Sequence, residues 1–140
     1  MVAASPAEAM LAPLKRISGF VLASLVDADS GMVLGAVSDD DGMSVPVASA
    51  GAADVVNVLS LMTSRLALRG DLEDVIVTLG SHYCLIQVLP PTPAGQLILL
   101  VTLDRPTANL AMARHEVRET VSAAAGPWFH GRPQLDSSSA

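Results

Sequence analysis

The closest approach to a catalytic metal motif in this chain is the run His115, Glu116 and Glu119. The zinc motif His-Glu-x-x-His needs two imidazoles one helical turn apart, with a glutamate between them as general base. Glu119 stands where the second imidazole should be, and the apolar residue Val117 predicts that His115 and Glu119 face solvent. We therefore interpret the run as a solvated helix face and expect no metal.

Two acidic clusters suggest cation binding or acid–base chemistry. The run 39–42 (Asp-Asp-Asp-Gly) resembles part of a calcium loop, but the first and twelfth loop positions would then be Val37 and Ala48, where calcium requires carboxylates. Loop solvation is the preferred interpretation, with weak adventitious cation binding as the alternative. The second cluster, Asp71, Glu73 and Asp74, precedes a predicted strand. We interpret these carboxylates as gatekeepers of an exposed strand rather than as an acid–base pair.

A cysteine–histidine nucleophile pair is the remaining catalytic candidate. His82 and Cys84 share one face of a predicted strand, but a reactive cysteine needs a polarised thiolate in a cleft. Cys84 is followed by Leu85 and Ile86, which favours a role as a small core residue. The chain also lacks a glycine-rich phosphate loop and a Gly-x-Ser-x-Gly elbow. We expect no catalytic residues, no cofactor and no enzymatic activity.

Composition narrows the class of protein further. The 140 residues are 51% hydrophobic, carry a net charge of −6 and include one cysteine. An intramolecular disulfide is impossible, and the absence of a basic cluster argues against nucleic acid or an anionic membrane as partner. The longest unbroken apolar run, Leu97–Val101, is far shorter than a membrane span. With no secretory signal visible, a cytoplasmic location is expected.

Hydrophobic periodicity predicts one α/β domain over residues 5–125, with helix, two strands, helix, three strands and helix in that order. A capping box at Ser5 begins the first helix, which Pro13 is expected to kink and Gly19 to end. The later helices are expected at 47–68 and 106–125, and the strands at 20–26, 32–37, 75–79, 82–89 and 96–103. Residues 126–140 are expected to form a flexible tail.

Two of these elements need a partner surface. The helix 47–68 carries only two charges, Asp54 and Arg65, so it is expected to be covered on both sides. The strand 75–79 is apolar on both faces and would be an aggregation-prone sheet edge if left open. A twofold dimer satisfies both needs with one self-complementary interface.

The element order and the nearly uncharged helix agree with a resemblance carried by two stretches of sequence. These are GFVLASLVDADSGMVLGA (19–36), and DLEDVIVTLGSHYCLIQVL (71–89) leading to LILLVTLDRPTANLAMARHEV (97–117). From about Leu11 to Ala124 the chain resembles the roadblock (dynein light-chain type) domain family, in particular small MglB-like single-domain members from actinobacteria. The resemblance implies a three-layer α/β/α sandwich with a five-stranded antiparallel sheet of order 2-1-5-4-3.

The resemblance also implies a function. Roadblock proteins form dimers through their middle helices and third strands, have no catalysis of their own, and act as scaffolds or regulators of small Ras-like GTPases. We therefore expect a homodimer that binds an MglA-like GTPase or an associated signalling kinase. The expected dimer residues are Val55, Val58, Leu59, Met62, Leu66, Val75 and Val77. The expected partner-binding residues, on an accessible ridge of small side chains with charged margins, are Ala53, Asp54, Asn57, Ser64 and Arg65.

Two alternatives remain open at this stage. Related three-layer sandwiches hold small molecules beside the sheet, so the chain could be a ligand-sensing domain if it has a pocket with convergent polar groups. Candidates in the strands are limited to Gln87, His82 and Tyr83. A protein partner could also dock on the opposite side of the sheet, against the first and last helices.

Overall fold

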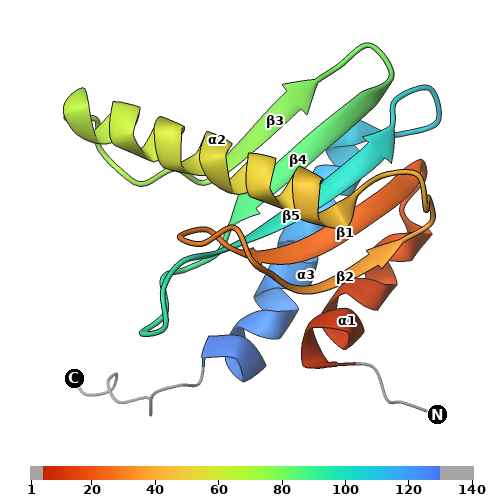
Figure 1. The fold of residues 1–140 in the computed structure, drawn as a ribbon, viewed down its shortest axis with the longest axis horizontal. Coiled ribbons are helices and arrows are strands. Elements are labelled where there is room, and N and C mark those ends of the chain that lie inside the picture. The colour runs from red at the N-terminus through yellow and green to blue at the C-terminus, as the bar shows by residue number, and fades with distance from the viewer. Residues whose placement is uncertain (1–4, 130–140) are drawn as a thin grey trace.

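The computed structural model describes residues 5–129, with side chains described up to Ala124. Figure 1 shows a five-stranded antiparallel sheet with helices on both faces. The elements are α1 (Pro6–Leu11), the 3-10 helix η1 (Ala12–Arg16), β1 (Phe20–Asp27), β2 (Val33–Ser38), α2 (Val45–Arg65), β3 (Asp74–Thr78), β4 (His82–Val88), β5 (Leu97–Asp104) and α3 (Leu110–Phe129). The strand order is β2-β1-β5-β4-β3. The predicted fold class, element order and strand order are confirmed.

The first helix forms as its sequence predicts. The Ser5 side chain accepts a hydrogen bond from the backbone N–H of Glu8, and the Glu8 carboxylate accepts one from the N–H of Ser5. This reciprocal pair satisfies two donors that would otherwise be unpaired at the helix start. At Pro13 the α-helix gives way to the 3-10 turn, which is the expected kink.

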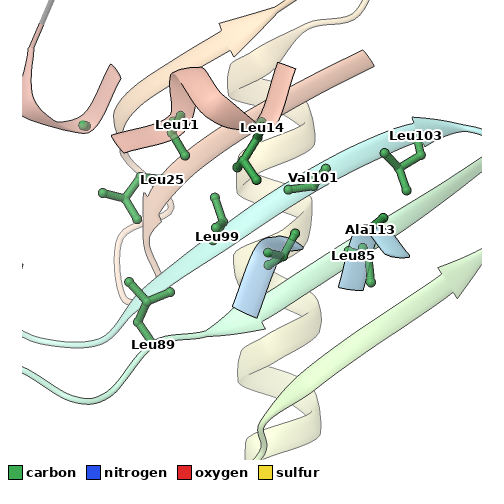
Figure 2. Close-up of a cluster of buried hydrophobic side chains, with 12 residues drawn as sticks. Leu11, Leu14, Leu25, Leu85, Leu89, Leu99, Val101, Leu103 and Ala113 are labelled. Atoms are coloured by element: carbon green, nitrogen blue, oxygen red, sulfur yellow. The ribbon is translucent and has the colours of Figure 1, made fainter. Parts of the chain in front are cut away.

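The core lies in two layers, one on each face of the sheet. The central strands β1 and β5 are buried on both faces, so their residues alternate between the two layers. Figure 2 shows the layer beneath α1 and α3, where Leu11 and Leu14 meet Leu25, Leu99 and Val101. The opposite layer packs the sheet against the first half of α2. Aliphatic side chains therefore fill both layers.

One polar contact lies inside the second layer. The hydroxyl groups of Ser24 on β1 and Ser49 on α2 are 2.9 Å apart, and both residues are fully buried. A buried hydroxyl is costly without a partner, so each serine satisfies the other. This hydrogen bond fixes the start of α2 on the sheet.

Removing one serine should therefore cost more than removing both. Ser49→Ala is expected to lower the free energy of unfolding by about 1–3 kcal/mol, because the Ser24 hydroxyl stays buried without a partner. The double variant Ser24→Ala/Ser49→Ala should lose less than the sum of the two single losses. Urea unfolding at one fixed protein concentration measures all three variants. Strictly additive losses would show that the two hydroxyls do not act as a pair.

The ends of both long helices differ from the prediction. The α2 helix begins at Val45 behind the Ser44 cap and stops at Arg65, because Ala67 adopts a positive φ of 53°. The α3 helix begins at Leu110, where Asn109 accepts a hydrogen bond from the backbone of Met112. It continues through Gly126 and Pro127 to Phe129; this proline lies in the last turn, where it removes a single helical hydrogen bond. The rest of the predicted tail, 130–140, lies outside the described residues.

Candidate interaction surface

The α2 helix is packed on the sheet over only part of its length. Its four buried residues, Ser49, Ala52, Ala53 and Val56, all lie before Asn57. From Asn57 to Arg65 no residue of the helix is buried in this chain. In Figure 1 this second half of α2 extends past the β1–β2 hairpin.

The uncovered part of α2 is strongly apolar. Val58 is 65% exposed and Leu61 51%, although neither side chain has a polar atom to offer to water. Among the described residues, α2 is the one helix long and apolar enough to cross a membrane by length and composition. A helix covered on both sides by protein has the same composition. Ser49 and Ala52 are buried between α2 and the sheet. The outer face of α2 is therefore the side of the helix that no other part of the described chain covers.

The two flanks of α2 face different parts of the sheet. On one flank, the Asn57 side chain donates a hydrogen bond to the Ala28 carbonyl at 2.9 Å, and Ala50 lies against Gly31. This flank therefore faces the β1–β2 turn. Since β3 and β4 lie at the other end of the strand order, the opposite flank faces them. That flank presents the stripe Val55, Leu59, Met62 and Leu66, spaced at helical intervals.

Six of the seven predicted dimer residues lie on the flank of α2 that faces β3 or on β3 itself, whereas Val58, 65% exposed, lies on the outer face of the helix. Val75 and Val77 lie on the α2 side of β3, because each pairs with a β4 residue, Ile86 or Cys84, that packs into the core layer beneath α2. The stripe on α2 and these two valines therefore lie on the same side of the sheet. The exposed fractions include 36% for Val55 and 47% for Met62. The role of these residues in dimerisation stays a prediction.

The predicted partner-binding ridge needs a correction. Ala53 is only 3% exposed because it packs into the core layer beneath α2, so it cannot touch a partner. Asn57 lies at the surface, but its amide already holds the β1–β2 turn through Ala28. Asp54, Ser64 and Arg65 are exposed as predicted. The ridge is therefore shorter than its sequence pattern suggested.

The acidic cluster before β3 has a role that sequence reasoning missed. Asp74 is not a free gatekeeper: its carboxylate accepts hydrogen bonds from Arg114 at 2.8 Å and Arg118 at 3.2 Å. The hydrogen bond and the charge of Asp74 raise the pKa of the Arg114 guanidinium above its ordinary value, and Glu73 adds to this. The contact ties the sheet edge to α3. The four-residue spacing of the two arginines was the available signal, because it places both on one helix face.

A groove of about 920 Å³ lies where the end of α2 overhangs the strand ends. This groove is the feature that best matches the small-molecule pocket expected under the ligand-sensing alternative. Its three amide side chains are engaged within the protein: Asn57 with Ala28, Gln87 with the Glu73 carbonyl, and Gln96 with the Leu89 carbonyl. A specific small-molecule site needs convergent polar groups free to bind the ligand. The groove is better explained as space beneath the overhanging helix.

The residues considered above as catalytic candidates occupy positions typical of structural side chains. His115 and Glu119 are both exposed, as their helix pattern predicts. Cys84 is half-buried and packs against the core, and the His82 ring bonds the adjacent Ser81 hydroxyl at 2.7 Å. Within residues 5–129 no three histidine, cysteine, aspartate or glutamate side chains gather as a metal site would require.

The chain has the roadblock fold, as comparison with solved structures shows. Myxococcus xanthus MglB matches over 97% of this chain and 100% of its own, with a TM-score of 0.78 and 11% identity. The Roadblock/LC7 domain from Streptomyces avermitilis matches over 90% and 99%, with a TM-score of 0.74 and 21% identity. The Thermus thermophilus gliding protein MglB matches over 89% and 92%, with a TM-score of 0.72 and 14% identity. The sequence matches no family model and no curated protein. The predicted resemblance is thus confirmed for the fold.

Proposed function

We propose that this chain is a non-enzymatic, dimeric regulatory module that acts in the cytoplasm and binds a small Ras-like GTPase of the MglA type or an associated signalling kinase. One observation carries the proposal: the second half of α2 is apolar yet buries no residue in its own chain. Soluble proteins rarely expose an apolar patch this extended unless it binds something. The likeness in fold to MglB supports a regulatory role.

Self-association accounts for the flank of α2 that faces β3. A twofold axis beside this flank sets the stripe Val55, Leu59 and Met62 against the same stripe of a second copy. The same axis brings the two β3 edges together. One isologous interface would thus cover the apolar helix and satisfy the open strand. A stable interface of this kind buries on the order of 1,200–2,000 Å².

The GTPase or kinase contact then falls on the remaining outer surface of α2. Asp54 and Arg65 are exposed charges of opposite sign near the two ends of this surface, and Ser64 lies beside Arg65. Charges at the rim of an interface affect orientation and association rate more than total affinity. The exposed apolar side chains of Val58 and Leu61 lie on the same helix face between these two charges.

The direct test is binding to a purified small Ras-like GTPase of the MglA type. We expect binding that depends on the bound nucleotide, measured by calorimetry with the GTPase loaded with GDP or with a non-hydrolysable GTP analogue. Asp54→Arg/Arg65→Asp should weaken that binding at least about tenfold, because each reversed charge would then face a like charge on the partner. His115→Ala, on the far face of the sheet, is the control and should bind like the wild type. Equal affinity of the double variant would place the contact elsewhere, and no binding in either nucleotide state would refute the GTPase proposal.

A further inference from the structure

The net charge of the chain is carried by one stretch of its sequence. Residues 27–54 contain six aspartates and no lysine, arginine or histidine, so this stretch has a charge of −6. The rest of the chain holds eight acidic and eight basic side chains, whose charges cancel. The stretch covers the β1–β2 turn, all of β2 and the first half of α2. So uneven a distribution gives one part of the surface a strong negative potential.

The fold places most of these aspartates along one edge of the sheet. β2 is the outermost strand, at the opposite end of the strand order from β3. Figure 1 shows the β1–β2 turn at one end of this strand and the loop that leads into α2 at the other. Asp29 lies in the turn and the aspartates at 39–41 lie in the loop, and all four are exposed. One ion pair, between Lys15 and Asp39 at 3.3 Å, offsets only part of this negative charge.

An exposed apolar patch lies among these charges. Val47, in the first turn of α2, is 73% exposed, and Met32, just before β2, is 69% exposed. These are the two most exposed large apolar side chains in the described part of the chain. Ala50 lies against Gly31, the neighbour of Met32, so the helix and the strand contribute to one surface. The β2-side patch consists of these side chains and their exposed neighbours: Met32, Leu34, Pro46, Val47 and Ala50.

The β2-side patch is separate from both surfaces assigned above. The flank of α2 that is proposed to form the dimer faces β3, which lies at the other end of the sheet. The proposed GTPase or kinase contact lies further along α2, between Asp54 and Arg65. The β2-side patch therefore stays exposed in the proposed dimer. An apolar patch with a charged rim is typical of a site that binds another molecule.

The chemistry of the β2-side patch selects the kind of partner. Its acidic rim disfavours nucleic acid and anionic membranes and attracts lysine and arginine. Addition of a partner strand to the β2 edge is also disfavoured, because Leu34 is the extra residue of a β-bulge that interrupts the backbone ladder. An amphipathic helix needs no such ladder, since it binds through its apolar side chains.

We propose that the β2-side patch binds a cationic amphipathic helix of a partner protein. The apolar face of that helix covers Met32 and Val47. Its lysine or arginine side chains lie over Asp29 at one end of the patch and over the aspartates at 39–41 at the other. The apolar contacts contribute most of the affinity, and the charges set the orientation of the helix.

A designed peptide tests this chemistry directly. The probe is a fluorescently labelled helix of about four turns, with leucine on one face and lysine on the other. Fluorescence anisotropy should show saturable binding to the wild-type protein. Met32→Ser/Val47→Ser should weaken this binding at least about tenfold, because two apolar side chains no longer become buried. Met112→Ser removes an exposed apolar side chain from α3, on the opposite face of the sheet, and should stay within about twofold of wild type.

Neutralising the rim tests the role of charge. Asp29→Asn/Asp41→Asn should weaken peptide binding at least about fivefold at low salt, and added salt should weaken binding to the wild type because exposed charges are screened. Glu116→Gln/Glu119→Gln is the matched control, because it removes the same charge from exposed positions on α3. This control should bind within about twofold of wild type. Equal weakening by the two double variants would indicate a general attraction to an acidic protein and would overturn the proposal.

Two further outcomes would also contradict the proposal. The first is a wild-type protein that shows no saturable binding of the peptide. The second is weakened binding in Val58→Ser/Leu61→Ser with none in Met32→Ser/Val47→Ser, which would place the peptide on the outer surface of α2. The variants of the β2-side patch leave both charged residues of the GTPase test unchanged. Failure of this proposal is therefore distinguishable from failure of the proposed function.

Discussion

Met62→Glu is expected to abolish the proposed dimer and leave a monomer throughout the micromolar range. Met62 lies on the α2 stripe that faces β3 and is 47% exposed in the single chain, so a carboxylate there is tolerated by the monomer. In the dimer that carboxylate would be buried without a partner, once in each copy, at a cost of several kcal/mol. We expect the dissociation constant to rise at least about 100-fold, measured by sedimentation equilibrium.

Ser64→Glu provides the matched control on the same helix. It adds the same charge two residues away, on the flank with Asn57 that faces the β1–β2 turn. Its dissociation constant should stay within about threefold of wild type, and both variants should keep the wild-type circular dichroism spectrum. Should Ser64→Glu dissociate the dimer while Met62→Glu leaves it intact, the twofold axis would lie on the other flank of α2.

Gly35→Ala is expected to be the most damaging single-methyl change in the sheet, lowering the free energy of unfolding by about 2 kcal/mol. Alanine ordinarily suits a strand at least as well as glycine does, so propensity alone would predict no loss. In this structure a Cβ added at Gly35 would lie 2.5 Å from the Cβ of Ala7 and 3.3 Å from the backbone nitrogen of Glu8. The α1 helix would have to move away from β2 to make room.

Two further variants make this prediction specific. Gly80→Ala is the matched control, because a Cβ there would meet no atom within 4 Å, and its unfolding free energy should change by less than about 0.5 kcal/mol. Adding Ala7→Gly to Gly35→Ala should recover part of the loss, since it removes the methyl group that is too close. Urea unfolding measures each variant. Equal losses for Gly35→Ala and Gly80→Ala would mean that α1 packing does not depend on this close approach.

The sequence alone determined most of the local structure. The spacing of Ser5 and Glu8 predicts the capping box that begins α1. Each strand is predicted by a short apolar run between turn residues. The near absence of charge on α2 and the apolar faces of β3 also predicted that both elements need cover from a second protein surface. The hydrophobic pattern of an element indicates how many of its sides must be buried. The helix ends were predicted less accurately. The predicted end of α2 was residue 68, but the helix stops at Arg65 because Ala67 adopts a positive φ.

Contacts between distant segments were decided by the tertiary structure. The sequence pattern placed Ala53 on an accessible ridge, but the crossing of α2 over β1 and β5 buries it. Likewise, the carboxylate of Asp74 bonds Arg114 and Arg118, forty or more residues away in the sequence. Ser24 on β1 bonds Ser49 on α2 within the core layer beneath that helix. Hydrophobic periodicity determines which residues share one face of a helix or strand. The direction in which that face points depends on the angle at which the elements cross, and only the folded chain sets this crossing angle.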